Sequence, residues 1–220
     1  MKAMILAAGR GERMRPLTDE IPKPLLEVHG KTLVEYRLES LRAAGIHECV
    51  INLSYKAKQI EDYLGDGNRW DMSIQYSHEG DDPLESAGGI IQALPLLGEN
   101  PFVLTNADIW TDFNFQNLPA KLTDLAHLIM VNNPEHHPNG DFSLKNGTLR
   151  STGTDRLTYS GIGIYSPLLF KNYAPGKQAL KPILLQAMKQ NQITGQHYSG
   201  TWFDIGTPER LEQLNQTNRV

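Results

Sequence analysis

The segment from Leu6 to Lys23 carries the strongest chemical signal in the chain. It reads LAAGRGERMRPLTDEIPK, in which two glycines are followed by arginines and by a lysine that stands between two prolines. Glycine lets the backbone approach an anion closely, and free N–H groups together with fixed positive charges stabilise negative oxygens. We therefore expect this segment to bind a polyphosphate.

Two aspartates far apart in the sequence are candidate ligands for a metal ion. Asp108 follows the expected strand Phe102–Thr105, and Asp204 lies in the expected strand Thr201–Ile205. Mg²⁺ prefers a few carboxylates together with phosphate oxygens and water. Position alone is equally consistent with an Asx turn at Asp108 and with a surface acid before a helix at Asp204.

The elements that must position these residues alternate between strands and helices. In the first half we expect strands at Ala3–Leu6, Cys49–Leu53, Ser73–Tyr76 and Phe102–Thr105, and helices from Thr32 to Gly45, at Gln59–Leu64 and at Ser86–Leu94, the last ended by Pro95. This order predicts a mainly parallel sheet covered by helices on both faces, with ligands at the carboxyl ends of the strands. The glycine-rich turn and Asp108 both follow such ends, so we expect them to face each other.

The second half has a more mixed pattern. We expect strands at His127–Val131, Tyr159–Tyr165, Ile193–Tyr198 and Thr201–Ile205, a hairpin of Phe142–Leu144 and Thr148–Arg150, and helices at Leu180–Gln190 and after Thr207-Pro208. No linker or repeat separates the halves. We therefore expect one domain over residues 1–220, with a first half of about residues 1–110 and a smaller lobe of about residues 111–220.

Composition disfavours several classes of protein. The chain has 220 residues, of which 40% are apolar and 21% charged, and a net charge of -4, so a large nucleic-acid-binding surface is not expected. No apolar run approaches the ~20 residues of a membrane span, and the N-terminal apolar stretch is too short for a signal peptide. The single cysteine, Cys49, is expected to be a buried thiol. These features predict a cytoplasmic protein without membrane or nucleic-acid partners.

The glycine-rich turn differs from two other phosphate-binding motifs. A dinucleotide fingerprint would place a third glycine near Met14 and an acid at the end of the second strand, where the chain has Asn52-Leu53-Ser54. The phosphate loop that ends in Gly-Lys-Ser/Thr is also absent from the sequence. Hydride transfer is therefore disfavoured.

Three motifs together resemble those of the sugar-1-phosphate nucleotidylyltransferases. They are Leu6 to Thr18 with Pro22-Lys23-Pro24, Asn106-Ala107-Asp108, and the WFDIGTP of residues 202–208. The resemblance covers essentially the whole chain and implies a Rossmann-like three-layer α/β/α nucleotidyltransferase fold, with a mostly parallel mixed central sheet, a nucleotide-binding half and a sugar-binding lobe. It also implies an enzyme that joins a nucleoside triphosphate to a sugar 1-phosphate, with Mg²⁺ as cofactor.

The resemblance also implies roles for the charged residues. Asp108 and Asp204 would bind Mg²⁺, and Arg13, Lys23 and Asp108 would be catalytic. The ammonium of Lys23 suits the α-phosphate, and the planar guanidinium of Arg13 suits the β- and γ-phosphates and the leaving pyrophosphate. Because a phosphate monoester is largely ionised above its second pKa of ~6, the reaction needs positioning and positive charge but no general base.

Further residues are expected to bind the two substrates. The nucleotide is expected to contact Leu6, Ala7, Ala8, Gly9, Gly11, Arg13, Lys23, Glu79, Gly88 and Gly89. The sugar phosphate is expected to contact Asn106, Gly140, Asp141, Ser160 and Gly161. Glu79 could accept from uracil N3–H, although it could equally be an exposed loop acid. The Glu-Lys-Pro segment that many family members carry in the second lobe is absent, so the cation for the sugar phosphate stays open among Lys145, Arg150 and Arg156.

Three features point to one substrate pair within the family. They are Gly11-Glu12-Arg13-Met14, His136-His137 followed by Gly140-Asp141-Phe142, and Tyr159-Ser160-Gly161-Ile162. They resemble members that use UTP and N-acetylmuramate 1-phosphate in peptidoglycan recycling. The alternatives are mannose 1-phosphate with GTP, glucose 1-phosphate with dTTP or UTP, phosphocholine with CTP, and a non-catalytic nucleotide-sugar-binding regulatory subunit. We expect a monomer or a small homo-oligomer, and the two histidines are expected in a loop.

Overall fold

A nine-stranded sheet runs through both halves of the chain in the computed structural model, which describes residues 1–217. Its order is β5–β4–β1–β6–β11–β8–β12–β10–β9. The strands are β1 (Ala3–Leu6), β4 (Glu48–Leu53), β5 (Ser73–His78), β6 (Phe102–Asn106), β8 (Ala126–Val131), β9 (Phe142–Lys145), β10 (Thr148–Arg150), β11 (Arg156–Tyr165) and β12 (Ile193–Tyr198). The strands β5, β4, β1 and β6 are parallel, whereas β11 is antiparallel to β6 and β8.

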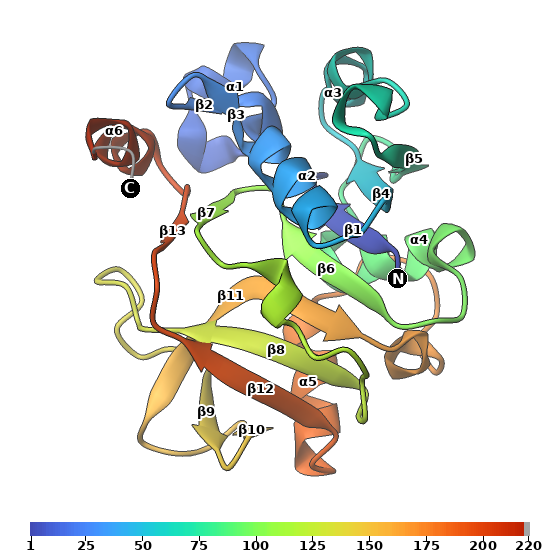
Figure 1. Cartoon of the computed structure of the whole chain (residues 1–220), viewed down its shortest axis with the longest axis vertical. Helices are drawn as coiled ribbons and strands as arrows, with labels where there is room; N and C mark the ends of the chain where they lie inside the picture. The colour runs from blue at the N-terminus through green and yellow to red at the C-terminus, as the bar shows by residue number, and fades with distance from the viewer. Residues whose placement is uncertain (218–220) are drawn as a thin grey trace.

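Helices cover both faces of this sheet. They are α1 (Leu17–Glu20), α2 (Leu33–Ala43), α3 (Ala57–Leu64), α4 (Glu85–Leu97), α5 (Leu180–Lys189) and α6 (Pro208–Gln216). Met4 and Leu104 pack with α4 and α5, whereas their neighbours Ile5 and Val103 pack with α2 and α3. In Figure 1, α2 lies in front of the sheet and α5 behind it. This alternation of side chains confirms the predicted three-layer α/β/α arrangement.

Two predicted helix boundaries had different outcomes. The capping box of α2 is present, because Glu35 N donates to Thr32 Oγ1 at 3.3 Å and Thr32 N donates to Glu35 Oε2 at 2.9 Å. The expected end of a helix at Pro95 is wrong, since α4 continues to Leu97. Pro95 lies in the last turn, where it removes only its own N–H bond, and the amide of Gly98 still donates to Leu94 O at 2.9 Å.

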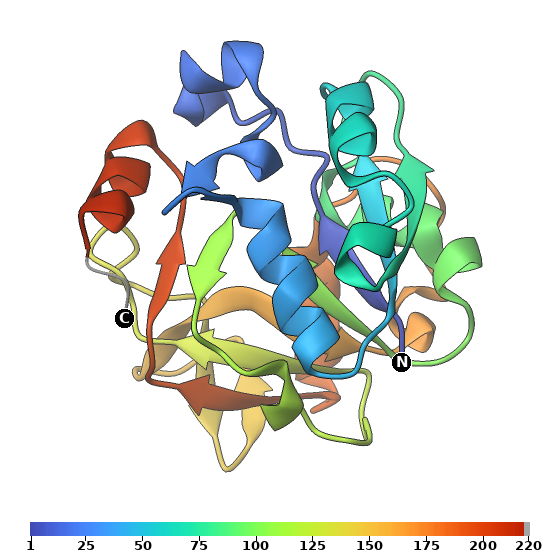
Figure 2. The same cartoon turned by 45° about the horizontal axis from the view of Figure 1, so that its top comes forward.

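Three of four short strands were not predicted from the sequence, and the fourth, expected at Thr201–Ile205, is shorter than predicted. The four form the hairpin of β2 (Glu27–Val28) with β3 (Lys31–Thr32) and the antiparallel pair of β7 (Ile109–Thr111) with β13 (Trp202–Asp204). Figure 2 shows β13 running from the main sheet towards α6, beside β7. Runs of two or three residues carry too little periodicity to be recognised without their partners.

The remaining expectations for the fold concern a turn, a thiol and the membrane. The hairpin of β9 and β10 turns at Asn146-Gly147 as predicted, and Cys49 is buried. Short 3-10 turns lie at Glu12–Met14, Lys23–Leu25, Asn68–Trp70, Phe115–Asn117 and Pro167–Phe170. Over residues 1–217, none of the helices combines the length and apolar character needed to cross a membrane.

Candidate active site

The turn after β1 lies beside the end of β6 because the two strands are parallel neighbours. Leu6 pairs with Asn106 in register, and the amide of Ala107 donates to the carbonyl of Leu6 at 3.0 Å. Lys23 Nζ lies 2.5 Å from Asp108 Oδ2, and the lysine is buried. The structure therefore brings the glycine-rich segment and Asp108 together, as the order of elements predicted.

The second glycine of the turn is needed for its conformation. Gly11 has a φ of +66°, in the left-handed region that favours glycine, and a Cβ there would lie 2.9 Å from Thr18 Cγ2. Thr18 Oγ1 donates to the carbonyl of Gly11 at 2.9 Å, which holds the turn against α1. The turn then leads directly into the 3-10 turn that carries Arg13.

The three arginines of this segment differ in their partners. Arg10 donates to Asp81 O at 2.7 Å, and Arg15 Nε lies 3.2 Å from Asp19 Oδ1. The guanidinium of Arg13 has no protein partner within residues 1–217. Arg13 is therefore the arginine of this segment that keeps all its N–H donors for a ligand.

Three adjoining cavities open at this edge of the sheet. The central cavity, of about 220 Å³, is lined by Leu6, Ala7, Ala8, Gly9, Lys23, Pro24, Asn52, Glu79, Pro83, Glu85, Ser86, Asn106, Ala107 and Asp108. The arginine cavity, of about 680 Å³, is lined by Gly9, Arg10, Gly11, Glu12, Arg13, Met14, Lys23, Asp82, Pro83, Glu85, Asp108, Lys177 and Gly206. The α5 cavity, of about 420 Å³, is lined by Leu6, Glu85, Ser86, Leu104, Asn106, Asp141, Phe142, Tyr159, Ala179, Leu180, Lys181 and Leu184. Their shared residues make them parts of one site.

A chain of hydrogen bonds orders one wall of the central cavity. Asn52 Oδ1 accepts from Ala7 N at 2.8 Å, and Asn52 Nδ2 donates to Glu79 Oε1 at 2.6 Å. Glu79 Oε2 accepts from Leu84 N at 2.7 Å, and a Cβ at Gly89 would lie 2.3 Å from Glu79 Oε1. Glu79 is therefore a buried and oriented acid in the cavity wall, not an exposed loop acid.

The two glycines of α4, Gly88 and Gly89, pack against protein and line none of these three cavities. Gly89 lies against Glu79, and a Cβ at Gly88 would lie 2.2 Å from the carbonyl oxygen of Gly176. Their contact with the nucleotide therefore remains a prediction, and the packing alone accounts for the need for glycine at both positions.

Backbone pairing brings Asp204 to the same site. In the register of β13 with β7, Asp204 lies opposite Ile109, and the amide of Ile205 donates to the carbonyl of Asp108 at 2.8 Å. The two aspartates are thus neighbours across two paired segments, although almost half of the chain separates them in sequence. This pairing is the physical reason that the two acidic motifs share one site.

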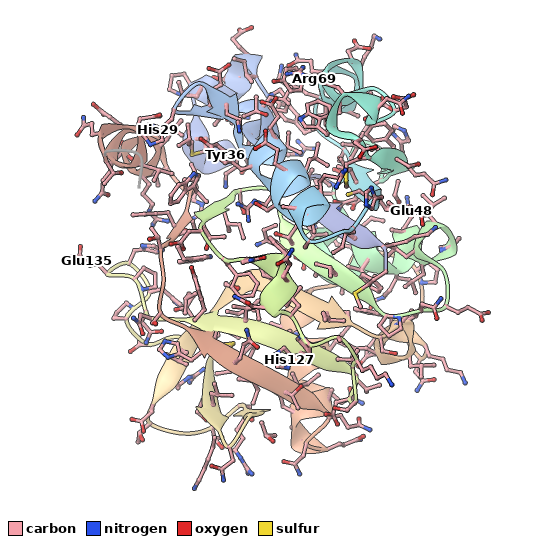
Figure 3. The ribbon with its side chains drawn as sticks, viewed as in Figure 1. His29, Tyr36, Glu48, Arg69, His127 and Glu135 are labelled. Atoms are coloured by element: carbon pink, nitrogen blue, oxygen red, sulfur yellow. The ribbon has the colours of Figure 1, made fainter. Side chains whose placement is uncertain are left out.

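Each of the two carboxylates is balanced by positive groups. Asp108 pairs with Lys23, while Asp204 pairs with Arg210 and lies 3.1 Å from His136 Nε2. The side chains of Asp108 and Asp204 are 38% and 28% exposed, so a ligand has access to both. The loop that carries His136, marked by Glu135 in Figure 3, connects β8 to β9.

This donor set fits a divalent cation that keeps other ligands. Within residues 1–217 no cluster of three or more His, Cys, Asp or Glu side chains is suited to a metal ion. Two carboxylate oxygens from Asp108 and Asp204 would leave the remaining positions to phosphate oxygens and water, which is the arrangement that Mg²⁺ favours.

The structure places two of the five residues predicted for the sugar in the α5 cavity. Asn106 and Asp141 line that cavity, whereas Gly140, Ser160 and Gly161 do not. Ser160 is buried within β11, and Gly161, with a φ of +81°, packs against the side chain of Asn106. Gly161 therefore leaves room for the side chain of Asn106. Direct contacts of Gly140, Ser160 and Gly161 with a sugar remain predictions.

Asp141 is held in place from three sides. Its Oδ1 accepts from Lys181 Nζ at 2.9 Å, and its Oδ2 accepts from Tyr159 N at 3.1 Å and lies 3.4 Å from His137 Nε2. Burial acts to raise the pKa of Asp141, but the hydrogen bonds from Lys181 and Tyr159 and the neighbouring charges outweigh it and lower the pKa. Asp141 is therefore an ionised acceptor in the cavity wall.

Sequence reasoning missed several residues of the site. Asn52 is the penultimate residue of β4 and pairs with Leu6 of β1, so the rule that ligands bind at the ends of parallel strands would have found it. Glu85 lines all three cavities with a φ of +60°, a strained conformation for glutamate that has no sequence signal. Lys181 of α5 lines the α5 cavity, which only the packing of α5 reveals.

The three cations left open for the sugar phosphate lie outside the cavities. Lys145 and Arg150 lie on the exposed hairpin of β9 and β10. Arg156 Nη2 donates to the carbonyl of Asp141. None of the three lines the central, arginine or α5 cavity, whereas Lys177 and Lys181 do.

Comparison with known proteins identifies the relatives of this chain. The model of the nucleotidyl transferase family matches residues 2–143. N-acetylmuramate alpha-1-phosphate uridylyltransferase of Neisseria meningitidis is 50% identical over 97% of this chain and 96% of its own length, and the enzyme of the same name from Caulobacter vibrioides is 33% identical over 94% and 92%. A mannose-1-phosphate guanyltransferase of Hypocrea jecorina is 27% identical over 95% of this chain and 62% of its own.

Solved structures share the fold at low sequence identity. The Bacillus anthracis protein assigned as a glucose-1-phosphate thymidylyltransferase has a TM-score of 0.85 at 20% identity and covers 100% of this chain and 97% of its own. HddC from Yersinia pseudotuberculosis, solved with GMP-PN, has a TM-score of 0.79 at 23% identity and covers 98% of each chain.

Proposed function

Because the chain belongs to the nucleotidyl transferase family of sugar-1-phosphate nucleotidylyltransferases, we propose that it transfers UMP from UTP to N-acetylmuramate 1-phosphate. The products are UDP-N-acetylmuramate and pyrophosphate, and the reaction serves the recycling of peptidoglycan sugars. The name of the Neisseria relative, 50% identical over 97% of this chain, describes the same transfer and supports this choice of substrates.

The observation that carries the proposal is the pair of Lys23 and Asp108, 2.5 Å apart, where the central and arginine cavities meet. Polar and backbone groups after β1 line the central cavity, and Arg13 lines the arginine cavity. This supports a nucleoside in the central cavity and a triphosphate that extends past Lys23 towards Arg13. The α5 cavity adjoins through Leu6 and Asn106 and would receive the sugar.

The chemistry follows from this placement. An oxygen of the sugar phosphate attacks the α-phosphorus and forms a new P–O bond, while the bond to the β-phosphate oxygen breaks and pyrophosphate leaves with the electron pair. Lys23 would stabilise the charge that develops on the α-phosphate, and Arg13 would bind the departing pyrophosphate. The attacking oxygen is already ionised at neutral pH, so no side chain has to remove a proton.

A divalent cation fits the two carboxylates of the site, and we propose Mg²⁺. Asp108 and Asp204 would hold it, with Lys23 and Arg210 close to their oxygens. When bound, it would neutralise the charge of both phosphates and let two anions approach.

A screen for pyrophosphate release tests the proposed substrates. The purified protein would be mixed with Mg²⁺, one of UTP, GTP, CTP, ATP or dTTP, and N-acetylmuramate 1-phosphate, N-acetylglucosamine 1-phosphate, mannose 1-phosphate, glucose 1-phosphate or phosphocholine. We expect the highest kcat/KM for UTP with N-acetylmuramate 1-phosphate. A higher value for GTP with mannose 1-phosphate, or for any other pair, would replace the proposed substrates.

A further inference from the structure

Lys181 is the only lysine, arginine or histidine that lines the α5 cavity among the residues described. It is the second residue of α5, and its Nζ lies 2.9 Å from Asp141 Oδ1 and 5.8 Å from the ring centroid of Phe142. Its side chain is 53% exposed. The ammonium therefore bonds a carboxylate that lines the same cavity, and half of its side chain stays accessible to a ligand.

The surroundings of Lys181 leave it capacity for a second anion. An ammonium has three N–H donors, and Asp141 receives one of them. Asp141 also accepts from the amide of Tyr159, so its negative charge is stabilised by two donors and not by Lys181 alone. The first turn of α5 holds no acidic residue and no side-chain cap, and positive charge at a helix N-terminus opposes the helix dipole. An anionic ligand would relieve this unfavourable placement.

The phosphate of the sugar substrate has a different place. Lys23 and Asp108 line the central and arginine cavities but not the α5 cavity, and Lys181 lines only the α5 cavity. Leu6 and Asn106 line both the central and the α5 cavity. A sugar phosphate that spans this border has its phosphate near Lys23 and its ring substituents near Lys181. A neutral hexose offers that ammonium no charge, whereas a sugar that carries a carboxylate does.

We propose that Lys181 determines the choice of sugar by binding the carboxylate that N-acetylmuramate carries and N-acetylglucosamine lacks. Asp141 orients the ammonium and the polar wall around it. This inference rests on the proposed function and adds to it the residue that separates an acidic from a neutral amino sugar.

A pair of substrates that differ only in the lactyl group tests the inference. Steady-state kcat/KM would be measured with UTP for N-acetylmuramate 1-phosphate and N-acetylglucosamine 1-phosphate, in wild type, Lys181→Met and Lys181→Arg. The affinities for UDP-N-acetylmuramate and UDP-N-acetylglucosamine would be measured by calorimetry, which does not depend on turnover. Lys189→Met is the matched control, because Lys189 is an exposed lysine in the last turn of the same helix.

We expect Lys181→Met to lower kcat/KM and affinity for the acidic sugar by about 10- to 100-fold and those for the neutral sugar by less than about threefold. Lys181→Arg should keep most of the wild-type kcat/KM and affinity for the acidic sugar. Lys189→Met should change these values for neither sugar. An equal loss on both sugars would assign Lys181 to the phosphate or to the fold, and no loss on the acidic sugar would remove it from the site. Either result overturns the inference alone, whereas wild-type protein inactive on N-acetylmuramate 1-phosphate would overturn the proposed function.

Discussion

Two parts of the site are assembled in different ways: the central and arginine cavities, proposed for the nucleotide and called the phosphate end, and the α5 cavity, proposed for the sugar and called the sugar end. The central and arginine cavities take most of their lining from residues 6–14 and 106–108, which follow the neighbouring parallel strands β1 and β6. The α5 cavity shares residues of β1, β6 and α4 and adds one side chain each from β9 and β11 and three from α5. Strand register and backbone N–H groups therefore shape the phosphate end, whereas side-chain identity shapes the sugar end. The difference indicates that one scaffold for phosphoryl chemistry can serve many sugars.

The largest expected effect tests whether substitutions at the phosphate end lower turnover equally for all sugar phosphates. Asp108→Asn and Asp204→Asn should each lower kcat by at least ~100-fold, about 3 kcal/mol of charge stabilisation. The factor should be the same for every sugar phosphate that turns over, as measured by pyrophosphate release. Asp62→Asn, an exposed acid on α3, serves as control. Near-wild-type turnover of either variant would remove that aspartate from the metal site.

The next effect concerns α2, which contacts the 3-10 turn that carries Lys23. Arg37 of α2 is fully buried, its Nε, Nη1 and Nη2 have no partner among the described residues, and burial lowers its pKa to about 10. Arg37→Met should raise the free energy of unfolding by about 1–3 kcal/mol and leave turnover unchanged, because it removes an unpaired buried charge. Urea denaturation measures the change, with Arg150→Met, at an exposed arginine of β10, as control. A loss of stability would show instead that the fold depends on this buried charge.

A smaller effect tests whether the KM for the nucleotide can change without a change in the KM for the sugar phosphate. Asn52→Ala leaves Ala7 N and Glu79 Oε1 without their shared partner, so KM for UTP should rise by about tenfold. KM for the sugar phosphate should change little, since Asn52 does not line the α5 cavity. Initial rates over both substrate concentrations measure the two constants, and the exposed Asn172→Ala is the control. A parallel rise of both KM values would mean that the two ends are not independent.

The smallest effect concerns the sugar end and depends on pH. The pKa of Asp141 is lowered in the folded protein, so its ionised form stabilises the fold above the ordinary Asp pKa of ~3.9. Asp141→Asn should lower the free energy of unfolding by about 1 kcal/mol at pH 7, a value discounted for the exposed Lys181. The difference should shrink as the pH falls below ~4, where the unfolded state takes up the proton first, and should vanish below the lowered pKa of the folded state, where both states are protonated. Urea titrations between pH 3 and 7 test this, and a constant difference would contradict it.

The two ends also differ in how well sequence predicted them. Leu6 to Gly9, Lys23 and Asp108 were predicted and line the central cavity, because a strand order that repeats β-α-β fixes which strand ends are neighbours. At the sugar end the prediction of Ser160 and Gly161 led to buried β11 residues outside the cavity, and Lys181 was not predicted. Side chains from a helix and an antiparallel strand meet only through packing, which leaves no periodic signal.

Sequence alone determined the family and the α/β/α layers and predicts a polyphosphate at the turn after β1, because these depend on local patterns of glycine, charge and hydrophobic alternation. The tertiary structure decided that Asp204 lies beside Asp108, through the pairing of two three-residue strands, and that Asn52, Glu85 and Lys181 line the site. Short strand pairs and helix packing gain their stability from contacts between residues far apart in the chain. Such contacts exist only once the whole sheet has formed.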